Sequence, residues 1–199
     1  LRVNLKTGKG RRFKSGVDNT VDWFVDKDGT VLAREDYNNT TDTYRVYTYV
    51  NGKRELIYEL ETSQLPPGVT GIKADRSALL FSDGSDADDS GNVYELDFSG
   101  HLTPASLGGK GGTIERIIKD GNRFVLGVEY SGAVPSYKFY DPDVDAAVSG
   151  MVNQFSTASV NLVSWTDDWS KLLYLIYGSD TPGSYVLQDR ETGQMMLVA

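Results

Sequence analysis

A short motif recurs along this chain at nearly constant spacing, and it limits the folds that the chain can adopt. Each copy consists of an Asp, mostly polar residues and then an apolar run. The four copies begin the segments 28–32, 75–79, 120–124 and 168–172. Their aspartates are 47, 45 and 48 residues apart, which indicates a structural repeat of about 46 residues.

A second marker runs in phase with the first. An aromatic residue begins an alternating strand that ends in a polar turn, and a further apolar stretch follows; the aromatics are Tyr44, Tyr94, Tyr137 and Tyr185. Each repeat is therefore expected to hold four short strands. The second strand is almost continuously apolar, as in 78–81 and 172–177, which is typical of a strand buried on both faces. The third strand alternates and lies nearer to solvent.

Buried inner strands and half-exposed outer strands are what radially stacked four-stranded blades require. The sequence thus predicts an all-β fold, a β-propeller fragment of four four-stranded antiparallel blades plus a half-blade hairpin at the N-terminus. The predicted boundaries are 1–14 for the half-blade and 15–60, 61–107, 108–152 and 153–199 for the blades. A helical solenoid is disfavoured because no window of about 12 residues has an apolar period of 3.6. A β-sandwich would not require two markers in register.

The half-blade is predicted from an internal match. Residues 3–9 align with residues 188–194 around a shared Thr-Gly turn, so residues 1–14 correspond to the third and fourth strands of a blade. The chain opens without an initiator Met, and it is interpreted as a fragment whose targeting segment, if any, would lie upstream. Because a propeller closes to hide its edges, we expect the exposed end blades to self-associate.

The composition of the chain limits the classes of partner and cofactor that it is expected to bind. The net charge of −8 disfavours nucleic acid and anionic membrane surfaces. The chain has no Cys, which excludes disulfides, thiolate zinc sites and a Cys nucleophile. No apolar run approaches the roughly 20 residues that span a bilayer. No cofactor is predicted, and the cellular compartment stays open.

Three segments, 5–10, 21–29 and 183–194, resemble the propeller of the prolyl oligopeptidase family of serine peptidases. That family includes bacterial members of the acylaminoacyl-peptidase and dipeptidyl-peptidase kind. The resemblance covers nearly the whole chain. It implies a non-catalytic domain that precedes an α/β-hydrolase domain, covers the active site and restricts access to short peptides. The implied partners are that hydrolase domain of the same polypeptide, absent here, and the peptide substrate of the parent enzyme.

The chain itself is not expected to be an enzyme. It has no G-x-S-x-G nucleophile elbow, and its one His, His101, follows a hairpin Gly, where a turn-surface role is expected. We therefore assign no catalytic, cofactor-binding or metal-binding residue. Two alternatives remain: a stand-alone propeller scaffold that binds protein partners, and a propeller that binds carbohydrate or metal.

Two acidic segments are candidates for calcium sites. Asp86, Asp88 and Asp89, with Asp97 further on, approximate an EF-hand loop. However, the last ligand position holds Asp on a strand instead of Glu on a helix, and a solvated loop is expected. The segment 141–145 is a similar acidic turn without the required Gly, for which a polar hairpin is predicted.

Two other features have a structural interpretation. The glycines around Lys110 lack the G-K-[ST] pattern of a phosphate-binding loop, so a link between blades is expected. Trp23 and Trp165 fall in first strands and are predicted to pack between blades. Trp169 falls in the turn before a second strand, where packing at the blade edge is preferred over ligand stacking.

Overall fold

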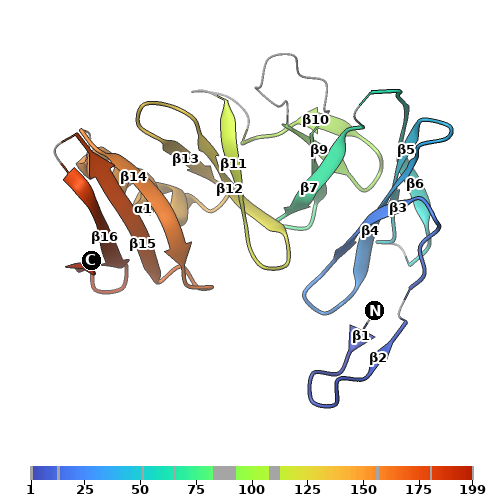
Figure 1. Cartoon of the computed structure of the whole chain (residues 1–199), viewed down its shortest axis with the longest axis horizontal. Helices are drawn as coiled ribbons and strands as arrows, with labels where there is room; N and C mark the ends of the chain where they lie inside the picture. The colour runs from blue at the N-terminus through green and yellow to red at the C-terminus, as the bar shows by residue number, and fades with distance from the viewer. Residues whose placement is uncertain are drawn as a thin grey trace.

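The computed structural model describes residues 2–12, 14–50, 52–64, 66–82, 93–107, 113–155, 157–179 and 181–198. The described part is mostly β-structure with one helix, arranged as several antiparallel sheets of which none closes on itself. Figure 1 shows the sheets following one another along the long axis of the molecule, in the order of the chain. The all-β expectation is therefore confirmed at this level.

The strands form four consecutive meanders, numbered here in chain order. The first contains β3 (Thr20–Val25), β4 (Val31–Asn38), β5 (Thr43–Thr48) and β6 (Glu55–Glu61). The second contains β7 (Gly68–Lys73), β8 (Ala78–Ser82), β9 (Val93–Asp97) and β10 (Leu102–Pro104). The third contains β11 (Ile114–Lys119), β12 (Phe124–Tyr130) and β13 (Ser136–Phe139). The fourth contains β14 (Ser159–Trp165), β15 (Lys171–Gly178), β16 (Thr181–Asp189) and β17 (Met195–Leu197).

The second and third meanders share backbone hydrogen bonds. β7 and β12 pair in parallel, with Phe124 opposite Ile72 and Val125 opposite Lys73, and so the two meanders form one seven-stranded sheet. Gly71 permits this close approach, because a Cβ at this position would lie 2.6 Å from the Val125 side chain and 2.7 Å from the Arg123 carbonyl oxygen. The junction thus depends on a residue without a side chain.

Three apolar cores hold the meanders together, one at each junction. The core between the first and second meanders contains Phe24, Tyr44, Val46, Ile72 and Phe81. The core between the second and third contains Leu80, Leu107, Val125 and Val128. The core between the third and fourth contains Tyr137, Phe139, Val160, Leu162 and Tyr174. Consecutive meanders therefore pack on one another through apolar faces in chain order, and the second and third are also joined by the pairing of β7 with β12.

Burial of the second strands follows their position in this row. Residues 78–81 of β8 are buried without interruption, as predicted. β15 instead alternates between buried and half-buried residues. The difference arises because the fourth meander packs on one face against the third meander and α1, while its other face is uncovered in the described part. The sequence expectation of burial on both faces is therefore wrong for β15 in this structure.

The third repeat differs from the predicted four strands. A 13-residue helix, α1 (Pro142–Gln154), follows β13, where an outer strand and a polar hairpin were expected. The side chain of Asp141 accepts hydrogen bonds from the backbone N–H groups of Asp143 and Val144, and Pro142 occupies the first turn, both of which favour a helix start. Val144, Val148 and Met151 are buried along one side of α1. Their spacing is the helical apolar period that the sequence reading missed.

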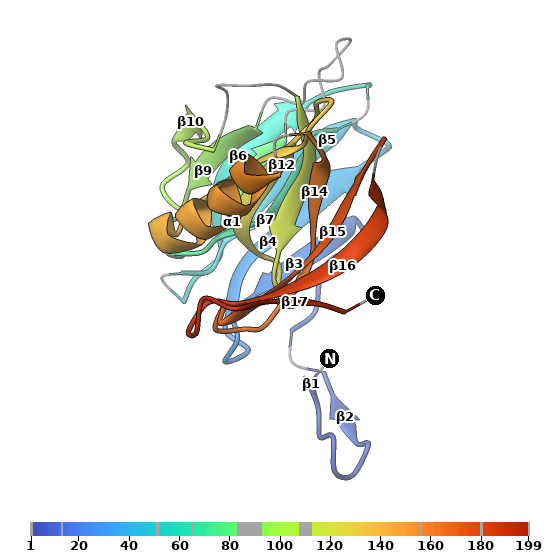
Figure 2. The same ribbon diagram turned by 90° about the vertical axis from the view of Figure 1, so that its left-hand side faces the viewer.

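A small hairpin precedes the meanders. It consists of β1 (Arg2–Val3) and β2 (Gly10–Arg11), and its described residues are exposed. In Figures 1 and 2 the hairpin projects away from the body of the molecule. It contacts the body where Arg2 Nη2 donates a hydrogen bond to the Asp28 carbonyl oxygen at 3.2 Å.

Candidate functional site

The recurring aspartates close the turns between the first and second strands. Asp28, Asp75 and Asp168 each accept a hydrogen bond through Oδ1 from the backbone N–H two residues later, at 2.8 to 3.0 Å. The residue after each Asp has a positive φ: 88° at Gly29, 62° at Arg76 and 59° at Trp169. The repeated motif therefore specifies one turn geometry, in which the Asp side chain satisfies a backbone donor.

The third turn corrects the register that the sequence suggested. There the positive φ falls on Arg123, at 66°, and Arg123 N donates to the Asp120 carbonyl oxygen, as Gly29 N does to Asp26. Asp120 is thus equivalent to Asp26, and Asn122 is equivalent to Asp28. The motif predicts Asp120 for this position because it is the Asp in this segment. Its carboxylate still closes the turn, by accepting from the N–H groups of Asn122 and Phe124.

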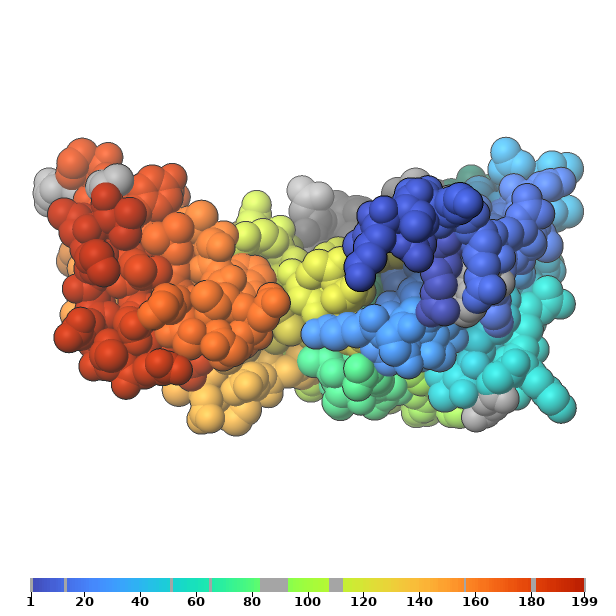
Figure 3. All heavy atoms as spheres, turned by 90° about the horizontal axis from the view of Figure 1, so that it is seen from below, coloured from blue at the N-terminus to red at the C-terminus, as the bar shows by residue number. Residues whose placement is uncertain are grey.

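Three of these turns are joined by charged side chains, and we call the segments 26–30, 73–77 and 120–124 the turn rim. Arg76 donates from Nε and Nη2 to the Asp26 carboxylate at 2.8 and 3.0 Å. Lys27 Nζ lies 3.2 Å from Asp120 Oδ2. Figure 3, viewed from below, shows the blue atoms of the first meander beside the yellow atoms of the third. Turns from three meanders thus meet on one side of the molecule.

Arg123 extends these contacts to the first strand of the first meander. Its two Nη atoms donate to the Asp22 carboxylate at 2.5 and 3.0 Å, and Nη2 also donates to the Trp23 carbonyl oxygen at 2.7 Å. The hydrogen bond from Arg123 lowers the pKa of Asp22, although partial burial opposes it. This fork-shaped pairing connects segments 101 residues apart.

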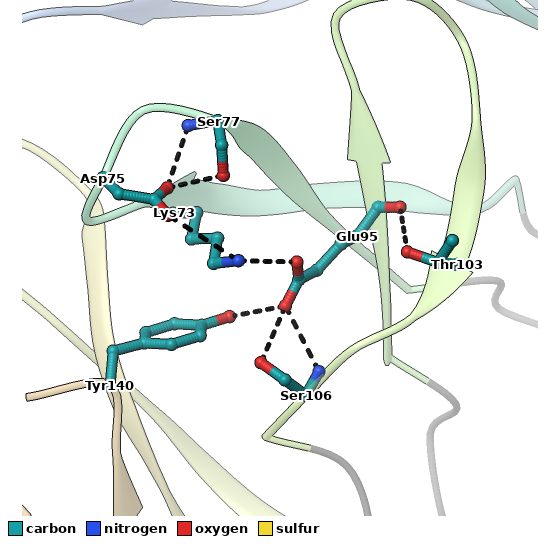
Figure 4. Close-up of polar contacts among 7 residues, drawn as sticks. All are labelled: Lys73, Asp75, Ser77, Glu95, Thr103, Ser106 and Tyr140. Atoms are coloured by element: carbon teal, nitrogen blue, oxygen red, sulfur yellow. Dashed lines mark hydrogen bonds and ion pairs between the residues drawn. The ribbon is translucent and has the colours of Figure 1, made fainter. Parts of the chain in front are cut away.

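A second polar cluster, shown in Figure 4, is centred on Glu95 of β9. Lys73 Nζ donates to Glu95 Oε2 at 2.8 Å, and Glu95 Oε1 accepts from Ser106 N at 3.2 Å, Ser106 Oγ at 3.0 Å and Tyr140 Oη at 3.2 Å. Burial acts against the ionised carboxyl, but the hydrogen bonds from Lys73 and Ser106 hold the pKa of Glu95 below its ordinary value. Burial raises the pKa of Tyr140. Because Lys73, Ser106 and Tyr140 all donate to Glu95, the cluster connects the end of the third meander to the second.

Two tyrosines that begin third strands contact the next meander. Tyr137 Oη donates to the Val160 carbonyl oxygen at 3.1 Å and accepts from Leu162 N at 3.1 Å, both in β14. Tyr44 Oη donates to Glu35 Oε1, and the same oxygen accepts from Val69 N in β7 at 2.9 Å. In these two repeats the aromatic marker therefore carries a polar contact to the next meander, whereas Tyr94 packs in the core between the first and second meanders. Tyr185, which begins the third strand of the fourth meander, is 39% exposed.

Glu35 is the buried acid in this arrangement. It is 5% exposed, and burial raises its pKa above the ordinary 4.5, although the hydrogen bonds from Tyr44 and Val69 work in the opposite direction. Burial, together with the neighbouring Glu35 carboxyl, also raises the pKa of Tyr44. The sequence analysis did not single out Glu35. The available signal was an acidic residue in the middle of a strand whose neighbours are buried.

The tryptophans lie in the predicted strands and turn, but only two of them pack between meanders. Trp165 and Trp169 stack at 5.0 Å between ring centroids, and Trp169 meets Phe139 of the third meander edge to face at 5.4 Å. The packing expected of Trp169 is thus present. Trp23 instead contacts Tyr49, at 5.7 Å, on the face of the first meander that points away from the second.

The other sequence candidates do not come together as a reaction centre in the described residues. His101 is exposed in the turn between β9 and β10, where its N–H donates to Asp97 Oδ1 at 2.9 Å. Asp86, Asp88, Asp89 and the segment around Lys110 lie outside the described residues. Among those that are described, no group of three His, Cys, Asp or Glu side chains is placed to hold a metal ion, and no helix is long and apolar enough to cross a membrane.

No model of a known protein family matches this sequence, and no curated protein matches it. Among solved structures, the chain is similar to a puromycin-hydrolyzing peptidase of Mycobacterium tuberculosis, with 16% identity and a TM-score of 0.40, over 94% of this chain and 29% of that one. It is also similar to a putative exported protein of Bacteroides fragilis, with 14% identity and a TM-score of 0.33, over 90% of this chain and 57% of that one. This chain spans less than two thirds of either protein. Similarity this low does not assign it to a family.

Proposed function

We propose that the four meanders are successive blades of a β-propeller, with blades at 15–60, 61–107, 108–152 and 153–199 and the hairpin of residues 1–14 as part of another blade. One observation carries this proposal: consecutive meanders pack face to face, and the tyrosine that begins a third strand reaches the first strand of the next meander. Tyr137 does so directly, and Tyr44 does so through Glu35. Tyr94 of the second meander packs instead in the core shared with the first meander. Consecutive meanders that pack on one another in chain order are what a radial arrangement of sheets needs.

The proposed role is that of a non-catalytic domain of a serine peptidase acting on oligopeptides. It would dock on an α/β-hydrolase domain and limit which substrates reach the active site. The resemblance of residues 5–10, 21–29 and 183–194 to the prolyl oligopeptidase family supports this role. A rigid ring excludes large substrates by size, and docking shields the reaction from bulk water.

The turn rim offers a direct test in the intact protein, by which we mean the polypeptide that on this proposal also contains the hydrolase domain. Arg76→Glu or Asp26→Arg breaks the contact between the first and second turns and should loosen this side of the ring. We expect each single variant to raise kcat/KM for an unfolded protein substrate several-fold relative to a tetrapeptide. Peptide hydrolysis is measured by mass spectrometry, and the reactive serine is labelled with a fluorophosphonate probe.

The matched control is the double variant Arg76→Glu/Asp26→Arg, which restores the ion pair with its charges exchanged. It should return the ratio of long to short substrates to the wild-type value. If the intact protein neither reacts with the probe nor cleaves peptides, the peptidase role is wrong. If it cleaves peptides but the single variants leave the ratio unchanged, the gating role is wrong.

A further inference from the structure

A small polar cavity lies on the face of the first meander that points away from the second meander. Its volume is about 110 Å³, and its wall includes Arg34, Asp36, Asn38, Arg45 and Arg54. The strand register places Arg34, Asp36 and Arg45 on the face opposite to Glu35 and Tyr44. Three guanidinium groups therefore face one carboxylate in the wall, in a chain whose net charge is −8.

Arg34 is the buried member of this wall. Its side chain is 4% exposed and lies between two rings, with the guanidinium carbon 5.4 Å from the centre of Trp23 and 4.9 Å from that of Tyr47. Nη2 donates to Asp36 Oδ2 at 2.6 Å. Nε is buried and has no hydrogen-bond partner among the described residues. A buried charged donor without an acceptor is costly, and Arg34 therefore has donor capacity that the described residues of the wall do not use.

The two other arginines are more exposed. Arg45 donates through Nε to Glu59 in an exposed ion pair. Arg54 lies over the ring of Tyr47, at 5.1 Å from its centre, and no ion pair joins it to any residue that the structure describes. Arg54 thus contributes a positive charge that the surrounding side chains do not balance.

The remaining polar groups of the wall are mostly available as donors. Both oxygens of Asp36 are occupied, Oδ1 by Thr20 Oγ1 at 2.9 Å and Oδ2 by Arg34. Asn38 Oδ1 accepts from the backbone N–H groups of Thr40 and Thr41, which leaves its amide nitrogen to donate. A wall of donors with excess positive charge selects an anion.

We propose that this cavity binds a carboxylate group, which accepts hydrogen bonds from Arg34 and Arg54. The volume suits a group of this size, and the negative charge of Asp36 in the wall disfavours a dianion such as phosphate. The carboxylate belongs either to a free ligand, such as a small organic acid or a peptide C-terminus, or to an Asp or Glu side chain of a segment that packs on this face. The site does not depend on the proposed function.

In the test, the intact protein is titrated with sodium acetate at constant ionic strength, and binding is measured by isothermal titration calorimetry. Arg54→Gln removes the uncompensated charge, and the matched control Lys53→Gln removes an exposed charge next to it that does not line the cavity. For a free ligand, the wild type and Lys53→Gln should bind acetate with equal affinity. Arg54→Gln should bind it about tenfold more weakly, the loss expected for one charge-assisted hydrogen bond.

For a carboxylate supplied by the protein itself, the wild type should not bind acetate. Arg54→Gln should then have a lower Tm than Lys53→Gln at neutral pH, and the difference should vanish when acid protonates carboxylates; loss of the Tyr47 contact alone would not titrate. Three results would overturn the proposal. They are equal acetate affinity in the two variants, tighter binding of phosphate than of acetate, and the absence of both acetate binding and a titrating Tm difference.

Discussion

Glu35 links two sheets through a carboxyl group whose ionised form is penalised by burial. Its carboxylate accepts hydrogen bonds from Tyr44 within its own meander and from Val69 in the next one, but it does so while almost fully buried. Burial penalises the ionised form more than these two hydrogen bonds favour it, and so the pKa is raised. The contact is therefore most favourable when the carboxyl is protonated.

This shift predicts the pH dependence of stability. Because the folded protein holds the proton more tightly than the unfolded chain, the contribution of Glu35 is fully present below its ordinary pKa of 4.5 and is lost as pH rises through the raised value. Glu35→Gln keeps an acceptor oxygen but cannot ionise, so it should remove this part of the pH dependence. Relative to the wild type, the variant should be more stable at neutral pH than it is at acid pH. Thermal unfolding between pH 4 and 8 measures the effect.

Glu61→Gln is the control for this prediction, since Glu61 is exposed at the end of the same meander. It should leave the wild-type slope unchanged. Parallel slopes for Glu35→Gln and the wild type across this range would contradict the assignment to Glu35.

Residue patterns in the sequence predicted the strands better than the contacts between them. The Asp turns and the third-strand tyrosines were visible as repeats because each repeat has a similar turn and a similar third strand. The choice between Asp120 and Asn122 was not visible, since the turn register depends on which residue adopts a positive φ. The cavity at Arg34 was also missed, because its arginines are brought together by strand pairing and not by spacing in the sequence.

At the scale of elements, α1 is the clearest departure from the repeat. It takes the place of an outer strand because Asp141 and Pro142 start a helix where the other repeats form a turn. The buried residues of α1 then pack in the core that joins the third and fourth meanders. The helical spacing of Val144, Val148 and Met151 was overlooked because the segment 141–145 reads as an acidic turn, which predicts a polar hairpin.

The N-cap of α1 can be tested by substitution. Asp141→Ala removes the acceptor for the N–H groups of Asp143 and Val144 and should lower the free energy of unfolding by about 1 kcal/mol. Asp141→Asn retains a capping oxygen and should stay within about 0.5 kcal/mol of the wild type. Denaturant unfolding gives both values, and equal losses in the two variants would argue against the capping role.

At the scale of the whole molecule, the row of meanders ends on a face that no other described element covers. Strand register places Leu173, Leu175, Tyr185, Leu187 and Met196 together on the face of the fourth meander that points away from the third. Tyr185 on this face is the equivalent of Tyr44 and Tyr137, whose hydroxyl groups take part in the hydrogen bonds to the next meander. An apolar face of this kind favours association with a further sheet.

We predict that the 199-residue chain self-associates through this face. Met196→Lys places a charge on it and should shift the sedimentation-velocity distribution towards the monomer. Met195→Lys is the matched control, because Met195 is also exposed but its side chain lies on the opposite face of β17. A monomer at every concentration, or an equal response to both substitutions, would contradict this prediction.

The parallel pairing of β7 with β12 makes one junction in the row stiffer than the others. There the polypeptide backbones are bonded to each other, whereas the junctions on either side depend on side chains such as Glu35, Arg76 and Tyr137. Under mechanical load, or in a thermal motion that moves the meanders apart, the second and third meanders should move together as one rigid body. The deformation would then occur mainly at the junctions between the first and second meanders and between the third and fourth, which would act as two hinges.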